Sequence, residues 1–229
     1  MKDDVQVEVV RVFTTAEGQL GNELGIVSAS EQTEGREQSV AAALGFSETV
    51  FIDDVERGVA RIRIFTPATE LPFAGHPSVG TAWWLREQGT PVNVLAEAAG
   101  EVAVQYDGDL TWISGRASWA PEFEWIECAT VDEVNALDPA RYVQGHHYAY
   151  AWVNEDAGHL RSRMFAPGMG IVEDEATGAA AVRITERLGR NLEITQGRGS
   201  RISTRLGPDG IVQVGGRTVF DRTVFSRTE

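Results

Sequence analysis

Two segments of this 229-residue chain repeat the same order of sequence features. Residues 61–67 read RIRIFTP and residues 161–167 read RSRMFAP, so two arginines, a phenylalanine and a proline recur at matching positions. A loop follows in each segment, and then an apolar stretch that a glycine closes, at Gly89 and at Gly189. Alternating apolar residues predict a strand, and the apolar stretch before glycine predicts a helix. We therefore expect a duplicated strand–loop–helix unit and two lobes of similar structure.

The loops of the two repeats align when His76-Pro-Ser-Val-Gly80 is placed over Asp174-Glu-Ala-Thr-Gly178, with a slip of two residues. This alignment puts His76 and Asp174 at equivalent positions, just before each helix. Lobes that face each other would then bring an imidazole and a carboxylate together, which suits acid–base catalysis. The plainer alternative is that Asp174 caps its helix and His76 is a loop residue with a backbone partner.

Strand patterns outnumber helix patterns along the chain, which indicates an α+β fold. Strands are expected at residues 5–13, 59–65, 100–106, 110–113, 148–153, 161–165, 201–206, 211–214 and 218–225. Helices are expected at residues 36–44, 78–88, 131–137 and 176–188, and Thr130 with Glu133 forms a capping-box pattern before the third. We place the N-terminal lobe at residues 1–93 and the C-terminal lobe at residues 94–229, whose last strand can pack back on the N-terminal lobe.

Charge and rare residues exclude several classes of function. The chain has 20 basic and 34 acidic residues, a net charge of −14, so nucleic acid and anionic membranes would repel it. Its only lysine is Lys2, beside the terminus, which argues against a pyridoxal-phosphate Schiff base or a Walker-type phosphate loop. Its only cysteine is Cys128, which excludes an intrachain disulfide, a cysteine-based zinc site and a racemase with two thiols.

We predict neither a metal nor a cofactor. His146 and His147 are adjacent, and neighbours on a strand point to opposite faces, so the pair does not form a metal site. The first residues lack the pattern of a signal peptide, and no apolar run is long enough to span a membrane. A cytoplasmic protein without a membrane or nucleic-acid partner is therefore expected.

Two further features indicate a site for a small anion. Each repeat starts a helix after a loop of small residues, and the free backbone N–H groups of a helix start attract a carboxylate. Glu48, within the segment GFSETVF, lies where a helix gives way to an apolar strand. A carboxyl group there can be partly buried with a raised pKa, although a solvated loop residue is the simpler interpretation.

The same residues resemble the signature segments of the PhzF-like isomerases, a family related to an enzyme of phenazine biosynthesis. Residues 70–82, ELPFAGHPSVGTA, resemble the first signature, and residues 163–178, RMFAPGMGIVEDEATG, resemble the second. Gly21-Asn22 and the SETVF segment also fit, so the likeness covers nearly the whole chain. It implies a diaminopimelate-epimerase-like fold, with two pseudo-symmetric lobes that each wrap a curved antiparallel sheet or barrel around a central helix.

The resemblance also implies roles for individual residues. Glu48 would shuttle a proton, while His76 and Asp174 would assist and orient the substrate. Backbone groups at Gly75 and Gly178 would hold a carboxylate. The chain departs from the phenazine enzyme at Glu175, where that enzyme has proline, and at Ala179, where it has a serine that would touch substrate.

The function expected from sequence is a cofactor-independent isomerase that moves a proton on a small carboxylate-bearing metabolite between the lobes. Two alternatives remain open. The chain could be a binding protein without catalytic activity on the same fold, or an epimerase that uses carboxylates in place of thiols. A homodimer is expected because members of the family commonly pair and symmetric dimers are the commonest oligomers.

Overall fold

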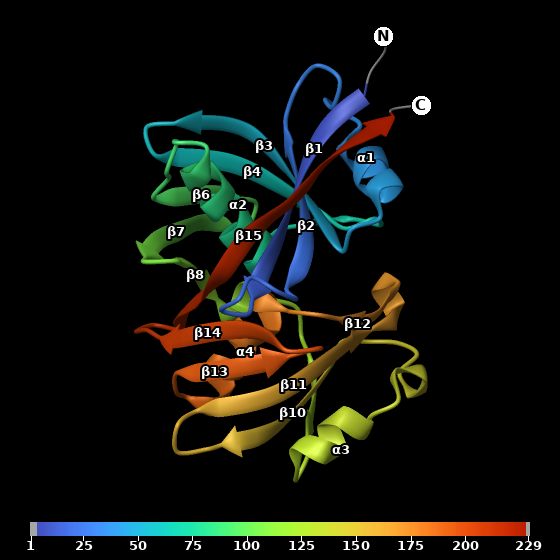
Figure 1. Cartoon of the computed structure of the whole chain (residues 1–229), viewed down its shortest axis with the longest axis vertical. Coiled ribbons are helices and arrows are strands. Elements are labelled where there is room, and N and C mark those ends of the chain that lie inside the picture. Colours follow the sequence, from blue (N-terminus) through green and yellow to red (C-terminus); the bar gives the residue numbers. More distant parts are fainter. Residues whose placement is uncertain (1–3, 228–229) are drawn as a thin grey trace.

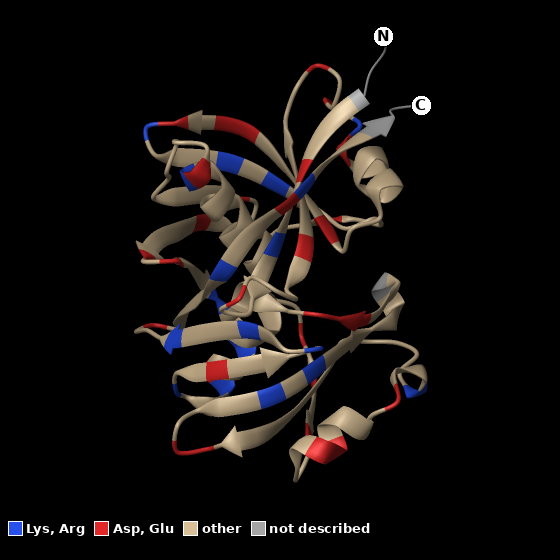
Figure 2. Cartoon of the chain, in the orientation of Figure 1, with Lys and Arg blue, Asp and Glu red and all other residues tan. Residues whose placement is uncertain are grey.

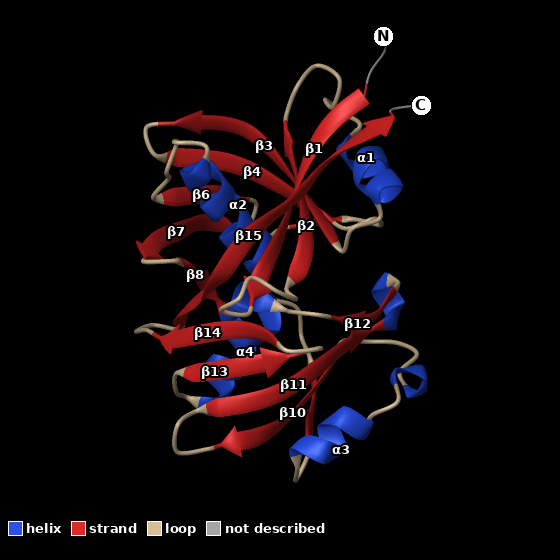
Figure 3. Cartoon of the chain, viewed as in Figure 1, coloured by secondary structure: helices blue, strands red, loops and turns tan. Residues whose placement is uncertain are grey.

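The computed structural model describes residues 4–227 and consists mainly of strands (Figure 1, Figure 3). The strands are β1 (Asp4–Thr14), β2 (Asn22–Ser28), β3 (Glu48–Glu56), β4 (Val59–Phe65), β5 (Glu70–Leu71), β6 (Val94–Glu97), β7 (Gly100–Asp107), β8 (Leu110–Arg116), β9 (Glu124–Glu127), β10 (His147–Asn154), β11 (His159–Ala166), β12 (Ile171–Asp174), β13 (Leu192–Gln196), β14 (Ser200–Leu206) and β15 (Ile211–Arg227). The helices are α1 (Glu37–Leu44), α2 (Gly75–Glu87), α3 (Val131–Ala136) and α4 (Gly178–Leu188), with short 3-10 helices η1 (Ala117–Trp119), η2 (Pro139–Arg141) and η3 (Pro167–Met169). This content confirms the α+β expectation.

The N-terminal strands close into a barrel. Strands β1, β2, β3, β4, β6, β7, β8 and β15 pair in that order, and β15 pairs again with β1. Helix α2 lies inside this barrel, in contact with β1, β8 and β15 (Figure 1). Its residues from Gly75 to Ala82 are all buried, because small and apolar side chains on every face let the sheet surround the helix.

The C-terminal strands form an open, curved sheet. Its order runs from β15 through β14, β13, β11 and β10 to β9, and β12 pairs with β11 beside this path. Helix α4 packs on β14 and β15 through Ala181, Val182 and Ile184, among other buried residues. The open side leaves room for Arg183 to reach out and bond to Glu122 at 2.7 Å. One central helix is thus enclosed, whereas the other is covered on one side.

Strand pairing corrects the position of the lobe boundary. Residue 93 falls between α2 and β6, but β6 pairs with β4, and β7 and β8 continue the same barrel. Residues 94–116 therefore belong with the N-terminal strands, and the change to the second sheet follows β8. The last strand, β15, does return to the N-terminal half, where it pairs with β1 and β8. One long strand had been expected as two, at residues 211–214 and 218–225.

The duplication is real, but its alignment differs from the one expected from sequence. Arg63 forms a bidentate ion pair with Glu70, and Arg163 forms the same pair with Glu173. Five residues after each glutamate a central helix begins, at Gly75 and at Gly178. Gly178 is thus the counterpart of Gly75 and not of Gly80. The alignment that made His76 and Asp174 equivalent was wrong, because η3 and its loop add three residues before the second glutamate.

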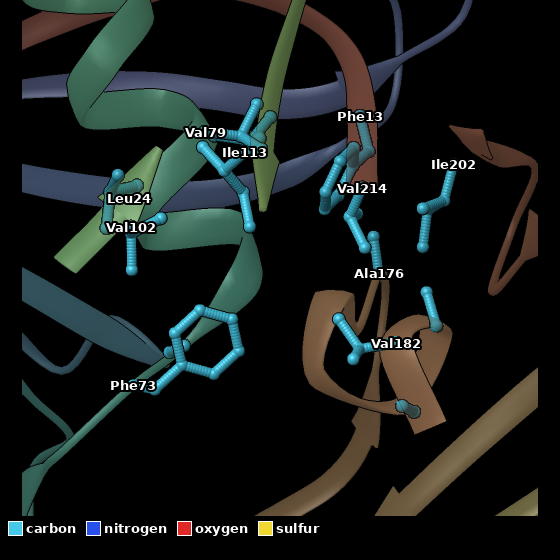
Figure 4. Packing of buried hydrophobic residues seen from close by; sticks show 14 of the residues in the cluster. Phe13, Leu24, Phe73, Val79, Val102, Ile113, Ala176, Val182, Ile202 and Val214 are labelled. Atoms are coloured by element: carbon cyan, nitrogen blue, oxygen red, sulfur yellow. The ribbon is translucent and has the colours of Figure 1, made fainter. Parts of the chain in front are cut away.

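A continuous core joins the two halves. Figure 4 shows side chains around α2, such as Val79 and Ile113, and side chains around α4, such as Val182 and Ile202, which belong to one buried cluster. A smaller cluster lies under α1. Acidic and basic residues are interspersed over both halves (Figure 2). At the start of α3 the Thr130 hydroxyl accepts a hydrogen bond from the Glu133 N–H, as the capping pattern predicted.

Candidate active site

The two central helices meet end to end at their amino termini. A Cβ atom built on Gly75 would lie 2.7 Å from the Gly178 Cα, and the reverse substitution is equally tight. Only glycine at both positions allows the backbones to approach this closely. Neither preceding residue, Ala74 or Thr177, caps its helix with a side-chain hydrogen bond. Two positive helix ends therefore converge on one place.

A cavity of about 420 Å³ lies beside this junction. Residues of both halves line it, and most are apolar or aromatic: Glu48, Thr69, Leu71, Pro72, Phe73, Ala74, Trp119, Ala120, Pro121, Phe123, His146, Met164, Ala166, Ile171, Asp174, Thr177 and Ala179. No lysine or arginine is among them. A small molecule with an apolar body fits such a lining, and its polar groups would meet few partners.

Glu48 is the first residue of β3, and its side chain is only 12% exposed. Its Oε2 atom lies 3.5 Å from the Nε2 atom of His76, which is 3% exposed in the first turn of α2. Neither of these two atoms has a hydrogen-bond partner within the part of the chain that the structure describes. Burial raises the pKa of Glu48 to about 7, although a hydrogen bond with Ser47 opposes the rise. A carboxyl group poised near neutrality can both take and return a proton.

His76 is neutral at physiological pH. Burial lowers its pKa to about 4, while the Asp174 carboxylate and a hydrogen bond with the Glu23 backbone oppose this effect only in part. The contact between His76 and Glu48 is therefore not an ion pair at neutral pH. The neutral ring can accept the proton of a protonated Glu48 through Nε2, because the Glu23 bond uses the other nitrogen.

Asp174 ends β12 and is fastened by two donors. Its Oδ1 accepts from Asn22 Nδ2 at 2.7 Å, and its Oδ2 accepts from the Thr177 hydroxyl at 2.5 Å. Burial, and to a smaller extent the nearby Glu48, raise the pKa of Asp174, which is about 6. His76 and the two hydrogen bonds lower it. Asp174 is thus mainly ionised at neutral pH and held in one orientation, and it does not cap α4.

The expected site residues are gathered in one place. Glu48, Asp174 and Ala179 line the cavity, His76 touches Glu48, and the backbones of Gly75 and Gly178 abut at the helix junction.

Sequence reasoning missed the aromatic walls, which come from Phe73, Trp119, Phe123 and His146. The alternation of neighbours did hold at the histidine pair. His146 lines the cavity, whereas the ring of His147 packs against Tyr142 with ring centroids 4.8 Å apart. That alternation could have marked His146 as a candidate.

The two departures from the phenazine enzyme have different consequences. Glu175 accepts hydrogen bonds from the Ser200 hydroxyl at 2.8 Å and from the Arg198 N–H at 3.1 Å, so it ties the loop before α4 to the start of β14. A proline could not make these bonds. Ala179 presents only a methyl group to the cavity, in the first turn of α4.

Within residues 4–227, no group of three or more His, Cys, Asp or Glu side chains is arranged to hold a metal ion. The same part of the chain contains no helix with the length and apolar character to cross a membrane. The chemistry that the site offers is proton transfer by Glu48 next to a place suited to an anion.

Comparison with known proteins bears on this chemistry. The family model described as phenazine biosynthesis-like protein matches residues 10–136 and 129–214. The trans-2,3-dihydro-3-hydroxyanthranilate isomerase of Pseudomonas fluorescens is 32% identical over 199 residues, which cover 70% of this chain and 71% of that protein. The isomerase of the same name from Pseudomonas aeruginosa is 31% identical over 217 residues, 78% of each chain.

Solved structures share the fold. A phenazine biosynthesis PhzC/PhzF protein from Clostridium difficile superposes with a TM-score of 0.78 over 98% of this chain and 100% of its own, at 18% identity. A hydroxyproline epimerase from Agrobacterium vitis superposes with a TM-score of 0.65 over 98% of this chain and 92% of its own, at 13% identity. With an eight-stranded barrel around a central helix, paired helix starts and both signature segments in place, the chain belongs to the phenazine biosynthesis-like family and is an isomerase.

Proposed function

We propose that this isomerase moves a proton on a small ring compound that carries a carboxylate, in the cavity beside the two helix starts, without a cofactor. The observation that carries the proposal is the buried contact between Glu48 and His76 at the cavity wall. A base is needed there, and residues 4–227 contain no lysine and only one cysteine that could serve instead. The substrate named for the Pseudomonas relatives belongs to this chemical class.

The carboxylate of the substrate would lie at the junction of α2 and α4. Backbone N–H groups at Gly75 and Gly178 would bind it, because helix starts attract anions and the described lining residues include no lysine or arginine. The ring would lie against the aromatic walls. Asp174, held by Asn22 and Thr177, would orient a donor group of the substrate, such as an amine or a hydroxyl.

The proton transfer takes two balanced steps. Glu48 as a carboxylate removes a proton from a ring carbon whose C–H bond is acidified by conjugation with the substrate carboxylate. The electron pair of that bond spreads over the ring and the carboxylate, where the helix ends stabilise the negative charge. Protonated Glu48 then returns the proton to another ring carbon, and His76 can hold the carboxyl group between the steps through Nε2. No oxidant, reductant or metal is consumed.

The test uses trans-2,3-dihydro-3-hydroxyanthranilate in deuterated buffer, followed by NMR. The expected result for the unmodified protein is a shifted ring double bond together with deuterium at the protonated carbon. Glu48→Gln should lower this rate by at least about 10³-fold, with little change in thermal stability. The matched control is Glu101→Gln, at an exposed glutamate of β7, which should leave the rate unchanged. If Glu48→Gln kept more than about a tenth of the rate, the assigned role would be wrong.

The same experiment separates the alternatives. A binding protein would bind the ring compound and exchange no proton. Dialysis against a chelator should leave the rate unchanged, whereas a loss restored by added metal would contradict the cofactor-free mechanism. The proposal of a homodimer is tested by light scattering, where the mass of a single chain across a wide concentration range would refute it.

One observation favours an epimerase as the second candidate. Thr49 pairs with Phe65 in one half and His147 pairs with Phe165 in the other, so the residues before them, Glu48 and His146, hold equivalent places. Both line the cavity. Two acid–base groups, one from each half, would suit inversion at one carbon, whereas one shuttle suits movement between carbons. Inverted configuration in the product, with the double bond unmoved, would favour the epimerase.

A further inference from the structure

Glu97 is a buried carboxyl group that the proposed mechanism does not use. It ends β6 and is only 9% exposed. Its Oε1 atom lies 2.6 Å from the hydroxyl oxygen of Ser78, in the first turns of α2. Its Oε2 atom is buried and has no hydrogen-bond partner among the described residues, 4–227. A charged carboxylate so poorly solvated would be costly, so its protonation state needs an explanation.

The number of hydrogens available around Ser78 indicates the protonation state of Glu97. The Ser78 oxygen is 2.7 Å from the carbonyl oxygen of Ala74 and 2.6 Å from Glu97. A hydroxyl has one hydrogen to donate, and both a carbonyl and a carboxylate only accept. Both contacts are hydrogen bonds only if Glu97 carries a proton and donates it to Ser78, which then donates to Ala74. Burial also favours the protonated form, because it raises the pKa of Glu97 to about 8.

The other half of the molecule holds a neutral side chain at the equivalent place. Arg61 pairs with Ala96, and Arg161 pairs with Thr195, so the next residues, Glu97 and Gln196, correspond. The Gln196 amide donates to the Asp174 carbonyl at 3.0 Å and to the Thr177 hydroxyl at 2.8 Å. Each buried side chain thus braces the start of a central helix. A glutamine does so without a charge, and a protonated glutamate is the closest chemical match to it.

We infer that Glu97 is a positioning residue that stays protonated, so that it fixes the first turn of α2 and leaves the amino end of that helix positive toward the substrate carboxylate. This inference rests on the carboxylate site proposed above. Ala74 lines the cavity and precedes the helix, and its methyl group cannot cap the helix with a hydrogen bond. The Glu97–Ser78 pair holds its carbonyl instead. An ionised Glu97 would put a negative charge within the first turns of the helix and weaken its attraction for an anion.

The consequence is a pH dependence in anion binding rather than in catalysis. The titratable groups nearest the helix junction are His76, Glu48 and Asp174, with pKa values of about 4, 7 and 6. Burial and the Ser78 hydrogen bond are the influences that set the pKa of Glu97. His76 and Asp174 have titrated by about pH 8, and a change at alkaline pH is assigned to Glu97 rather than to Glu48 because Glu97→Gln should abolish it. Ionisation of Glu97 should raise KM for a carboxylate substrate more than it lowers kcat.

The first experiment needs no ligand. Infrared difference spectra of the unmodified protein and Glu97→Gln should contain the band of a protonated carboxyl group at about pH 7, which disappears by about pH 9.5. Over the same range the NMR amide signals of Gly75 and His76 should move in the unmodified protein and stay in place in Glu97→Gln. A carboxylate band for Glu97 at about pH 7 would overturn the inference.

The second experiment measures binding of anthranilate, a ring with one carboxylate, by calorimetry. Between about pH 7.5 and 9.5 the Kd of the unmodified protein should rise about tenfold, while Glu97→Gln should bind equally at both values. Glu101→Gln, the exposed control, should follow the unmodified protein. Glu97→Leu should bind weakly at every pH, and equal binding by the leucine and glutamine variants would contradict a positioning role. If the infrared result holds but no variant binds anthranilate at about pH 7.5, the carboxylate site fails and the placement of the Glu97 proton stands.

Discussion

The two halves of the molecule share one frame and differ in the residues placed on it. Strand β4 with α2 repeats strand β11 with α4, down to the ion pairs of Arg63 and Arg163. At equivalent places relative to these strands, Leu71 stands opposite Ile64 and Asp174 stands opposite Met164. Counted from the two helix starts, His76 corresponds to Ala179, so only α2 carries an imidazole at this position. The duplication provides the geometry, and single substitutions provide the chemistry.

The two halves also differ in how their sheets surround the central helix, since the N-terminal barrel is closed and the C-terminal sheet is open. The barrel fixes α2 on all sides, which suits the half that holds the proposed base and its imidazole partner. The second sheet leaves α4 uncovered on one side, where η1 and the loop before β9 supply the cavity walls Trp119 and Phe123. The N-terminal half encloses its central helix and holds the proposed base, and the C-terminal half supplies most of the cavity lining.

The largest effect is expected where the halves touch. Gly178→Ala would place a methyl group 2.7 Å from the Gly75 Cα, against backbone that is itself enclosed by the barrel. The helices must move apart, which should destabilise the fold by about 2–4 kcal/mol and lower activity by about 10³-fold. Urea unfolding and the isomerase assay measure the two effects. A comparison variant is Ala179→Gly, one residue along, which removes an atom and should fold normally. Full activity in Gly178→Ala would show that the site does not depend on this close approach.

The next effect comes from making the halves more alike. Asp174→Leu copies Leu71 and leaves the Asn22 amide and the Thr177 hydroxyl without their acceptor. We expect kcat/KM to fall by about 10²–10³-fold and stability to fall by about 1–3 kcal/mol. Asp174→Asn keeps one acceptor atom, so its kcat/KM and its stability should lie between those of the unmodified protein and of Asp174→Leu. If the leucine variant kept more than about a tenth of the activity, Asp174 would not orient the substrate.

The sequence predicted the repeat and most elements, because both follow from local patterns. The alternation of residues 59–65 and 161–165 is visible in a single segment, and so is the glycine that ends each helix. The lobe boundary was missed because β6–β8 pair with strands far away in sequence, and no local pattern encodes a partner. The alignment of the loops failed for a related reason. An insertion such as η3 can be placed only when the matching ion pairs are seen.

The site was predicted to a different degree at different residues. Glu48, His76 and Asp174 lie together as the signature segments implied, but the contact of Glu48 with His76 depends on how β3 enters the barrel beside α2. The aromatic walls could not be foreseen, since Trp119 and Phe123 lie in a stretch without periodic pattern. The inferred neutral state of Glu97 depends on its burial and on the contacts of Ser78 with Glu97 and Ala74, which no local sequence pattern reveals.

The third effect concerns Glu97 and Gln196, the buried side chains at the starts of α2 and α4. It compares how the stability of the protein depends on pH with each of them exchanged. The folded pKa of Glu97, about 8, lies above its ordinary value of 4.5, so folding favours the protonated form. The free energy of unfolding therefore decreases as pH rises from about 4.5 to 8, and Glu97→Gln removes this loss. Relative to the unmodified protein, the variant should gain about 2–3 kcal/mol between about pH 5 and pH 7 in urea unfolding.

The opposite exchange provides the control. Gln196→Glu copies Glu97 into the C-terminal half and replaces an amide that donates to both the Asp174 carbonyl and the Thr177 hydroxyl. A carboxylate cannot donate to either, so this variant should lose stability as pH rises, by about 1–3 kcal/mol. If both exchanges left the pH dependence of the free energy of unfolding unchanged, Glu97 and Gln196 would not have equivalent roles at the two helix starts.

The smallest effect concerns Ala179, the counterpart of His76 at the start of α4. Its methyl group lines the cavity, so it offers a substrate hydroxyl or amine no hydrogen bond. Ala179→Ser would add a donor and acceptor within the first turn of the helix, beside the proposed carboxylate site. A site that bonds a substrate polar group discriminates strongly against losing that bond, so the gain in kcat/KM for trans-2,3-dihydro-3-hydroxyanthranilate should be about tenfold, or about 1.4 kcal/mol. The isomerase assay measures it, with Ala120→Ser, at another alanine that lines the cavity, as the control for added polarity alone. Equal gains in both variants, or none in either, would mean that the methyl group at Ala179 does not limit turnover of this ring.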